Sequence, residues 1–194
     1  MKGKGKEPMV IDEKSNDEEY SSTISMENNI TVILSSGDGA EFTVPFSVAK
    51  QSAVIAGIVN ETEDGTADQK RVVKVPCELV SGQVLELMVR YWKEHSDDQK
   101  GGGSDSSTAE LKKKKLKAWD KEFVKLENKL MFELVKGSHY LESIELMDLL
   151  CQTLADTIKD MSVEAVREFF DIQGDFTPEE EAKIKEDIKW VFDP

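Results

Sequence analysis

The sequence holds few of the residues that catalysis, metal binding or disulfide bonding require. Among 194 residues there are only two cysteines and two histidines. Cys77 and Cys151 have no CxxC spacing and stand among apolar neighbours, as small core or interface side chains do. His95 and His139 are far apart and belong to no Ser-His-acid, Cys-His or metal-binding motif. We therefore predict a protein that is not an enzyme, with no catalytic residue, no metal site and no cofactor.

Long apolar runs are also scarce, and the 25 basic residues are outnumbered by 39 acidic ones. The only apolar stretch near the N-terminus, Met9–Ile11, is too short for a signal peptide, and no run approaches the roughly 20 residues of a membrane span. The formal net charge is −14, whereas binding to nucleic-acid phosphates needs a positive field. We expect no membrane, no nucleic acid and no small-molecule substrate, and a location in the nucleus and cytoplasm.

What the sequence does contain begins with an α+β half. Residues 1–28 are polar without periodicity, which predicts a disordered tail. Ile30–Leu34 and Glu41–Val44 are rich in β-branched and apolar residues, and Gly37–Gly39 between them is typical of a tight turn. These residues predict a hairpin whose second strand ends at Pro45.

The chain then alternates between helical and extended patterns. Phe46–Val59 predicts one or two short helices broken near Ser52, and the polar residues 60–70 predict a loop. Val72–Val75 predicts a third strand closed by Pro76. In Ser81–His95 the apolar residues fall on one broad face at helical spacing, which predicts a helix.

A composition change divides the chain after His95. Residues 96–117 contain three consecutive glycines followed by a lysine run, and they predict a flexible linker. The lysine run at Lys112–Lys117 favours a solvated linker over a nuclear-import patch. Beyond the linker we predict helices at Trp119–Val124, Lys129–Leu141, Ser143–Ile158, Ser162–Phe170 and Pro178–Phe192. The predicted organisation is therefore a tail (1–28), a first α+β part (29–95), the linker (96–117), further helices (118–158) and a helical extension (159–194).

Two of these helices carry apolar surfaces. On the Ser143–Ile158 helix, spacings of three and four place one stripe of side chains on one side: Met147, Leu150, Cys151, Leu154 and Ile158. The spacing leaves a buried central helix and a groove for a partner equally open.

The last helix has well-defined ends and a displaced aromatic residue. Thr177 is a good N-cap, Pro178 suits the first helical position and Glu180 completes a capping box. An apolar face is formed by Ile184, Ile188, Val191 and Phe192. Trp190 points away from that face, which indicates contact with another chain.

A set of motifs in fixed order resembles one known family. The motifs are Ser35–Ser36, Asp38–Gly39, Phe42, Val48–Ser52, Val75–Pro76, Tyr91–His95, Trp119–Phe123, Phe132–Leu134, Tyr140–Leu141, Asp175–Glu181 and Trp190. Together they resemble the S-phase-kinase-associated adaptors, the Skp-type adaptors of SCF ubiquitin ligases, from about Asn29 to Phe192. The chain looks like a divergent, plant-like paralogue of that family.

The resemblance implies a BTB/POZ-type α+β domain with a C-terminal all-helical extension. It implies an adaptor that bridges the N-terminal domain of a cullin scaffold to F-box substrate receptors for ubiquitin-dependent degradation. The implied F-box-binding residues are Met147, Cys151, Leu154, Ile158, Phe170, Ile172, Phe176 and Trp190. The implied cullin-binding residues are His139 and Tyr140, where the family has an Asn-Tyr pair, so only the tyrosine is kept.

Several positions depart from the family pattern. Gly37 lengthens the first hairpin turn, and the linker ends in lysines where the family has acids. Gly137 lies inside a predicted helix, where it should cost about 1 kcal/mol relative to alanine. Ser162 lacks the glutamate that would close a capping box, so we expect the helix after it to fray.

Two alternative functions stay open from the sequence. One is an elongin-C-like adaptor, against which the capped final helix speaks, because those chains lack helices after about Ile158. The other is a BTB-type oligomerisation or transcriptional module, which would form homodimers and ignore F-box proteins.

Overall fold

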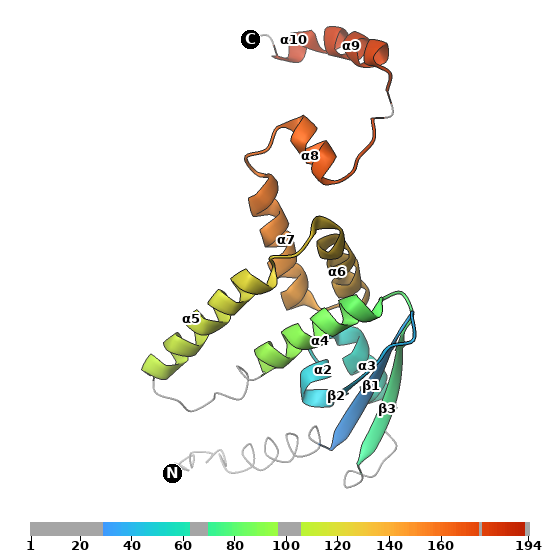
Figure 1. Cartoon of the computed structure of the whole chain (residues 1–194), viewed down its shortest axis with the longest axis vertical. Helices are drawn as coiled ribbons and strands as arrows, with labels where there is room; N and C mark the ends of the chain where they lie inside the picture. Colours follow the sequence, from blue (N-terminus) through green and yellow to red (C-terminus); the bar gives the residue numbers. More distant parts are fainter. Residues whose placement is uncertain (1–28, 63–69, 97–105, 175, 193–194) are drawn as a thin grey trace, which may run out of the picture. The chain divides into compact units, whose positions relative to one another are not determined.

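The computed structural model describes residues 29–62, 70–96, 106–174 and 176–192 (Figure 1). The predicted tail (1–28), most of the predicted loop (63–69) and the glycine-rich part of the predicted linker (97–105) lie outside the described residues. The chain divides into two compact units, Met1–Cys151 and Gln152–Pro194, and each is described by itself.

The first unit contains a three-stranded sheet in the order β2-β1-β3. The central strand β1 (Ile30–Ser36) pairs antiparallel with β2 (Glu41–Pro45) and parallel with β3 (Arg71–Cys77). The alternating pattern of the strands places one set of side chains on the buried face: Val32, Leu34, Val44, Val73, Val75 and Cys77. The predicted turn at Gly37–Gly39 is present, and Gly39 has φ +87, a conformation that glycine adopts without strain.

One strand end differs from the sequence prediction. β2 ends at Pro45, as predicted, whereas β3 continues through Pro76, which was expected to close it, to Cys77. Both strands are at the edges of the sheet. Proline has no backbone N–H to donate. In an edge strand this does not remove a hydrogen bond between central strands, which explains why proline is tolerated in β2 and β3.

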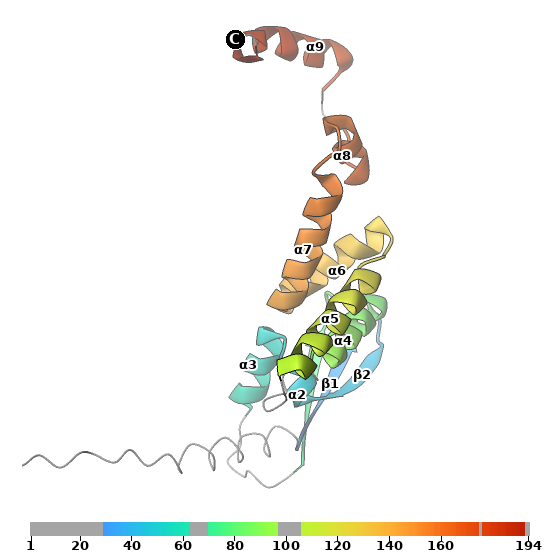
Figure 2. The same cartoon turned by 90° about the vertical axis from the view of Figure 1, so that its left-hand side faces the viewer.

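The helices of the first unit pack against the buried face of the sheet and against one another (Figures 1 and 2). They are α2 (Phe46–Ala49), α3 (Ala53–Glu61), α4 (Gly82–Ser96), α5 (Ser106–Phe123), α6 (Asn128–Tyr140) and α7 (Ile144–Ile158). The predicted break near Ser52 is real, because Ser52 is the N-cap of α3 and accepts a hydrogen bond from the N–H of Ile55. The α+β class predicted from the sequence is confirmed.

Trp92 of α4 is the largest fully buried side chain of the core. Its indole N–H donates to the hydroxyl of Ser143 at 2.8 Å, and its carbonyl accepts a hydrogen bond from the side-chain amide of Gln51 at 2.6 Å. A buried indole needs such a partner because an unpaired polar group in the interior costs free energy. These bonds connect α4 to the segments before α3 and α7.

Gly137 of α6 has a packing role that the sequence did not reveal. A Cβ atom at this position would lie 2.8 Å from Cγ1 of Val84 and 3.4 Å from Sδ of Met88, both in α4. Val84 and Met88 are themselves buried. The glycine therefore permits the close approach of α4 and α6. Alanine would favour the helix by its propensity, but its methyl group would clash with Val84.

Helix α5 occupies part of the predicted linker. The structure differs from the prediction over 106–117, which is helical, because alanine, glutamate, leucine and lysine are good helix formers. Its C-terminal end packs on α4 through ring contacts of Trp119 and Phe123 with Tyr91. His95 of α4 and Asp120 of α5 add a contact of 2.9 Å between Nε2 and Oδ1. We call these five residues the α4–α5 clasp.

The second unit continues α7 and adds α8 (Val163–Phe169), α9 (Pro178–Asp187) and α10 (Lys189–Phe192). The predicted capping box is confirmed, since the side chains of Thr177 and Glu180 each accept from the backbone N–H of the other. The single helix predicted over Pro178–Phe192 is instead interrupted at Ile188, where Val191 bonds back to Ile188 by a three-residue turn. Ser162 caps α8 by accepting from the N–H of Ala165 without a capping box.

Candidate partner-binding surfaces

The two sides of α7 differ in burial. Leu146 and Leu150 are fully buried on one side. On the other side, the structure keeps four stripe residues at least partly accessible: Met147, Cys151, Leu154 and Ile158. Leu150, predicted to share this stripe, therefore belongs to the core, while the remaining four form an accessible apolar strip along the helix.

The apolar side chains of the second unit are exposed to an unusual degree. Ile172 is 55 % exposed, Phe176 57 % and Trp190 76 %. Phe170 is half-buried and stacks edge-on against the neighbouring Phe169, with ring centroids 5.1 Å apart. An aromatic ring as exposed as that of Trp190 is typical of a surface that another protein covers.

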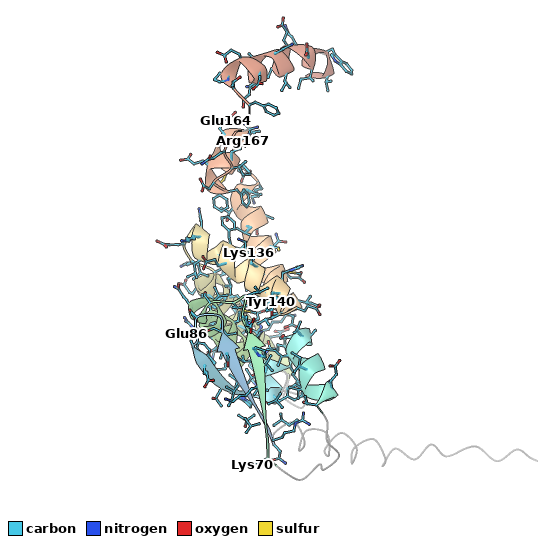
Figure 3. All side chains as sticks on the ribbon, turned by 90° about the vertical axis from the view of Figure 1, so that its right-hand side faces the viewer. Lys70, Glu86, Lys136, Tyr140, Glu164 and Arg167 are labelled. Carbon is cyan, nitrogen blue, oxygen red and sulfur yellow. The ribbon has the colours of Figure 1, made fainter. Side chains whose placement is uncertain are left out.

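No described side chain between Gln152 and Val191 is buried. Local interactions fix the helix ends: the Thr177 capping box and an ion pair of 3.4 Å between Arg167 of α8 and Glu181 of α9. Figure 3 labels Arg167 together with Glu164 on α8. Exposed ion pairs of this kind contribute about 0–1 kcal/mol, so they do not replace a hydrophobic core. The unit thus presents apolar groups that another chain can cover.

His139 and Tyr140 form a second accessible site at the end of α6. Both side chains are exposed, Tyr140 by 37 %. Tyr140 and Lys136 both project from α6 in Figure 3. Buried residues adjoin them in sequence, among them Ser138, whose hydroxyl donates to the carbonyl of Leu134 at 2.7 Å.

Hydrogen bonds hold the turn after Tyr140 in one conformation. Glu142 has φ 49, a positive value that is uncommon outside glycine, and its carbonyl accepts from the N–H of Ala53 at 3.3 Å. The hydroxyl of Ser52 donates to the carbonyl of Leu141. The start of α3 therefore supports the turn that follows Tyr140, and such support presents an exposed tyrosine from a fixed backbone.

Among the described residues, no group of three or more His, Cys, Asp or Glu side chains could hold a metal ion. Burial raises the pKa of the Cys77 thiol to about 11, so this thiol stays protonated at neutral pH. No helix in the described part of the chain is long and apolar enough to cross a membrane.

The sequence analysis missed an accessible apolar residue next to the strip of α7. Ile144 at the start of α7 is 60 % exposed and precedes Met147 by three residues, so it extends the accessible strip by one turn. The spacing was visible in the sequence, but spacing alone does not tell which end of an apolar stripe the core covers.

Comparison with family models places both units in one family. Residues 30–97 match the model described as the Skp1 family, tetramerisation domain. Residues 145–191 match the model described as the Skp1 family, dimerisation domain. The second match contains the stripe from Met147 to Ile158 on α7, helices α8 and α9, and α10 as far as Val191.

Curated relatives are similar along nearly their whole length. The chain is 37 % identical to SKP1-like protein 9 of Arabidopsis thaliana over 162 residues, covering 84 % of this chain and 97 % of the relative. It is 36 % identical to SKP1-like protein 1A of the same plant with the same coverage. It is 32 % identical to the E3 ubiquitin ligase complex SCF subunit sconC of the fungus Arthroderma otae, covering 84 % and 94 % of the two chains.

Proposed function

Because this chain belongs to the Skp1 family, we propose that it is the adaptor subunit of an SCF-type cullin ubiquitin ligase. The observation that carries the proposal is the accessible apolar surface of α7 and the second unit, which lies inside the family match at residues 145–191. The family match at residues 30–97 also agrees with the predicted BTB/POZ-type fold.

The first proposed surface binds F-box proteins. It consists of Met147, Cys151, Leu154, Ile158, Phe170, Ile172, Phe176 and Trp190, all of which are at least partly accessible. Burying an apolar helical face against a helical partner stabilises the complex by about 25 cal/mol for each Å² of apolar surface removed from water. Because the second unit has no buried side chain among its described residues, we expect its helices to become fully ordered only in the complex.

The second proposed surface binds the cullin N-terminal domain through His139 and Tyr140. Tyrosine offers a large rigid contact area and a hydroxyl at low entropic cost, which suits it to a binding hot spot. His139 stands where the family has an asparagine. We therefore expect this position to weaken cullin binding more than F-box binding.

The proposed mechanism is scaffolding. An adaptor that holds a substrate receptor and a cullin together raises the effective concentration of substrate near the charged ubiquitin-conjugating enzyme. Such a role needs no catalytic residue. We expect the protein to act in the nucleus and cytoplasm. Fluorescence microscopy of a fluorescent fusion of this chain tests that location.

The two alternative functions receive less support. An elongin-C-like chain would lack helices after about Ile158, whereas this chain has α8, α9 and α10 within the Skp1 family match. A BTB-type oligomerisation module would leave the apolar surface of the second unit without a partner. The relatives are SKP1-like proteins and an SCF subunit, so the comparisons favour neither alternative.

The decisive experiment is co-expression with a panel of F-box domains and a cullin N-terminal domain, read by size-exclusion co-elution. A ternary peak is the expected result. F-box binding without the cullin would leave the adaptor role only half supported and point to His139. Absence of both complexes would overturn the proposed function.

A double variant tests the F-box surface. Leu154→Asp combined with Trp190→Ala should abolish co-elution with F-box domains, because it places a charge in the strip and removes the aromatic ring that is most exposed among the described residues. Glu168→Gln, an exposed change on α8, is the matched control and should retain binding. Retained binding by the double variant would overturn the site assignment.

A further inference from the structure

Among the described residues, the ring contacts that join helix α5 to α4 lie near the C-terminal end of α5. Trp119 and Phe123, near its C-terminus, stack on each other with ring centroids 4.8 Å apart and contact Tyr91 of α4. Toward its beginning, Leu111 is 62 % exposed and all four residues from Lys112 to Lys115 are exposed. The first turns of α5 therefore project beyond the contacts that anchor the helix.

The outward face of α5 is basic. Lys113, Lys117 and Lys121 follow one another at intervals of four residues, and Lys114 lies beside them. All four are exposed, and none has an acidic partner within salt-bridge distance among the described residues. Like charges four residues apart on a helix repel one another, which favours an acidic partner over this face. We call these four residues the lysine face.

A basic face is unexpected on a chain with net charge −14. The complementary charge occurs within the same chain, in residues 12–19, which contain five acids and one lysine: Asp12, Glu13, Lys14, Asp17, Glu18 and Glu19. We propose that this acidic segment docks on the lysine face of α5. The inference does not depend on the proposed ligase role.

The residues between the acidic segment and β1 are numerous enough for the segment to reach the lysine face. Asn29 lies ten positions after Glu19, and an extended chain of ten residue steps spans roughly 33–36 Å. A compact domain of about 100 residues has a radius of gyration of about 13 Å, so this reach is comparable with the width of the first unit. The beginnings of β1 and α5 also lie toward the same end of that unit in both views (Figures 1 and 2).

Covalent connection makes weak attraction sufficient. A segment joined to its site by a short linker has an effective concentration in the order of mM, so an intrinsic Kd near 1 mM already gives about half occupancy. The contact is between exposed charges, and salt screens it over a Debye length of about 10 Å at 0.1 M ionic strength. Docking should therefore be strong at low salt and lost at high salt.

The test is zero-length carbodiimide cross-linking of the full chain, with mass spectrometry of the linked peptides. An equal mixture of unlabelled and ¹⁵N-labelled chains distinguishes links within one chain from links between copies. We expect same-isotope links from residues 12–19 to Lys114, falling by about tenfold when ionic strength is raised to about 1 M. Absence of these links, or equal yields of mixed-isotope links, would overturn the proposal.

Charge reversal supplies the matched variants. The triple variant Lys113→Glu, Lys117→Glu, Lys121→Glu should lose the link to the retained Lys114. The control Lys93→Glu, Lys129→Glu, Lys136→Glu makes the same change in net charge at exposed sites of the first unit and should keep it. Circular dichroism checks that both variants are folded.

A compensating change separates docking from general charge effects. Replacing the five acids of residues 12–19 by lysine in the triple variant should restore cross-linking between the two segments. Unchanged linking of the triple variant to Lys114, or no recovery after compensation, would contradict docking on the lysine face.

Discussion

The carboxylate of Asp38, in the turn between β1 and β2, accepts a hydrogen bond from the backbone N–H of Gly82, the first residue of α4. The Gly82 nitrogen lies 3.0 and 2.9 Å from the two carboxylate oxygens. The hydroxyl of Ser36 donates to the same carboxylate. A negative charge at this position also complements the positive end of the α4 dipole. A short turn of the sheet thus fixes the beginning of the central helix.

Asp38→Asn should make stability less dependent on pH in the acid range. Hydrogen bonds from Ser36 and then Gly82 lower the pKa of Asp38 in the folded state. A carboxyl group with a lowered folded pKa stabilises the fold above its unfolded pKa, about 3.9, and loses that effect as pH falls through the folded value. The stability difference between wild type and variant should be constant near neutral pH and shrink below about pH 4.

Urea unfolding at several pH values measures this difference. Ser36→Ala removes the hydrogen bond that lowers the pKa of Asp38 most. The loss of stability at acid pH should therefore begin at a higher pH in this variant than in wild type. A difference between wild type and Asp38→Asn that does not change below pH 4 would contradict the assigned role.

Gly137→Ala should destabilise the protein although alanine is the better helix former. The new methyl group would meet Cγ1 of Val84 at 2.8 Å, and Val84 is a stiff, buried, β-branched residue. Overpacking costs about 1–3 kcal/mol against a propensity gain of about 1 kcal/mol, so we expect a net loss of about 1 kcal/mol. Chemical denaturation gives the value.

Gly57→Ala is the matched control. Gly57 lies on α3, and an added Cβ atom would have no heavy atom within 4 Å. This variant should gain about 0.5–1 kcal/mol from reduced backbone entropy of the unfolded chain. Equal effects at both glycines would show that close packing of α4 and α6 is not what requires Gly137.

The pair His95–Asp120 should contribute measurable coupling to the α4–α5 clasp. Its side chains are only 13 % and 17 % exposed, so solvent screens the 2.9 Å contact poorly. A double-mutant cycle with His95→Ala and Asp120→Ala should give an interaction energy of about 1–2 kcal/mol. The exposed pair Lys125–Glu122, at 2.6 Å, is the control and should give below about 0.5 kcal/mol. Equal coupling in the two cycles would refute the distinction.

Tyr140→Ala should weaken binding of the cullin N-terminal domain by about ten- to thirtyfold, as expected for removal of a hot-spot tyrosine. F-box binding should be unchanged, because Tyr140 lies outside the proposed F-box surface. Isothermal titration calorimetry with each partner separates the two effects. His139→Asn, which recreates the Asn-Tyr pair of the family, should strengthen cullin binding, and a loss in both variants would contradict the proposed roles.

Thr177→Ala should weaken F-box binding without touching the apolar surface. The variant loses the side-chain cap of α9, which destabilises this helix by about 1 kcal/mol. If the helix becomes ordered on binding, the binding free energy is weakened by the same amount, which lowers the affinity about fivefold. Thr177→Ser keeps the cap and should bind normally. Affinity of the alanine variant equal to wild type would show that α9 is already formed in the free chain.

Local patterns in the sequence determined the local structure of this protein. Alternation of apolar residues defined the strands, spacings of three and four defined the helices, and Thr177 with Glu180 defined the start of α9. These features depend on neighbours along the chain, so periodicity and capping chemistry reveal them. The order of the family motifs likewise predicted the Skp1 family that the comparisons confirmed.

Only the tertiary structure decided which residues meet across the chain. It placed Leu150 in the core and left Cys151, its neighbour in sequence, exposed. It brought Asp38 to Gly82 and showed that Gly137 is needed where α4 and α6 approach closely. Burial and close approach depend on segments far apart in sequence. A pattern of residues along one helix identifies an apolar face, but the packing of the other elements determines whether that face enters the core or stays accessible to a partner.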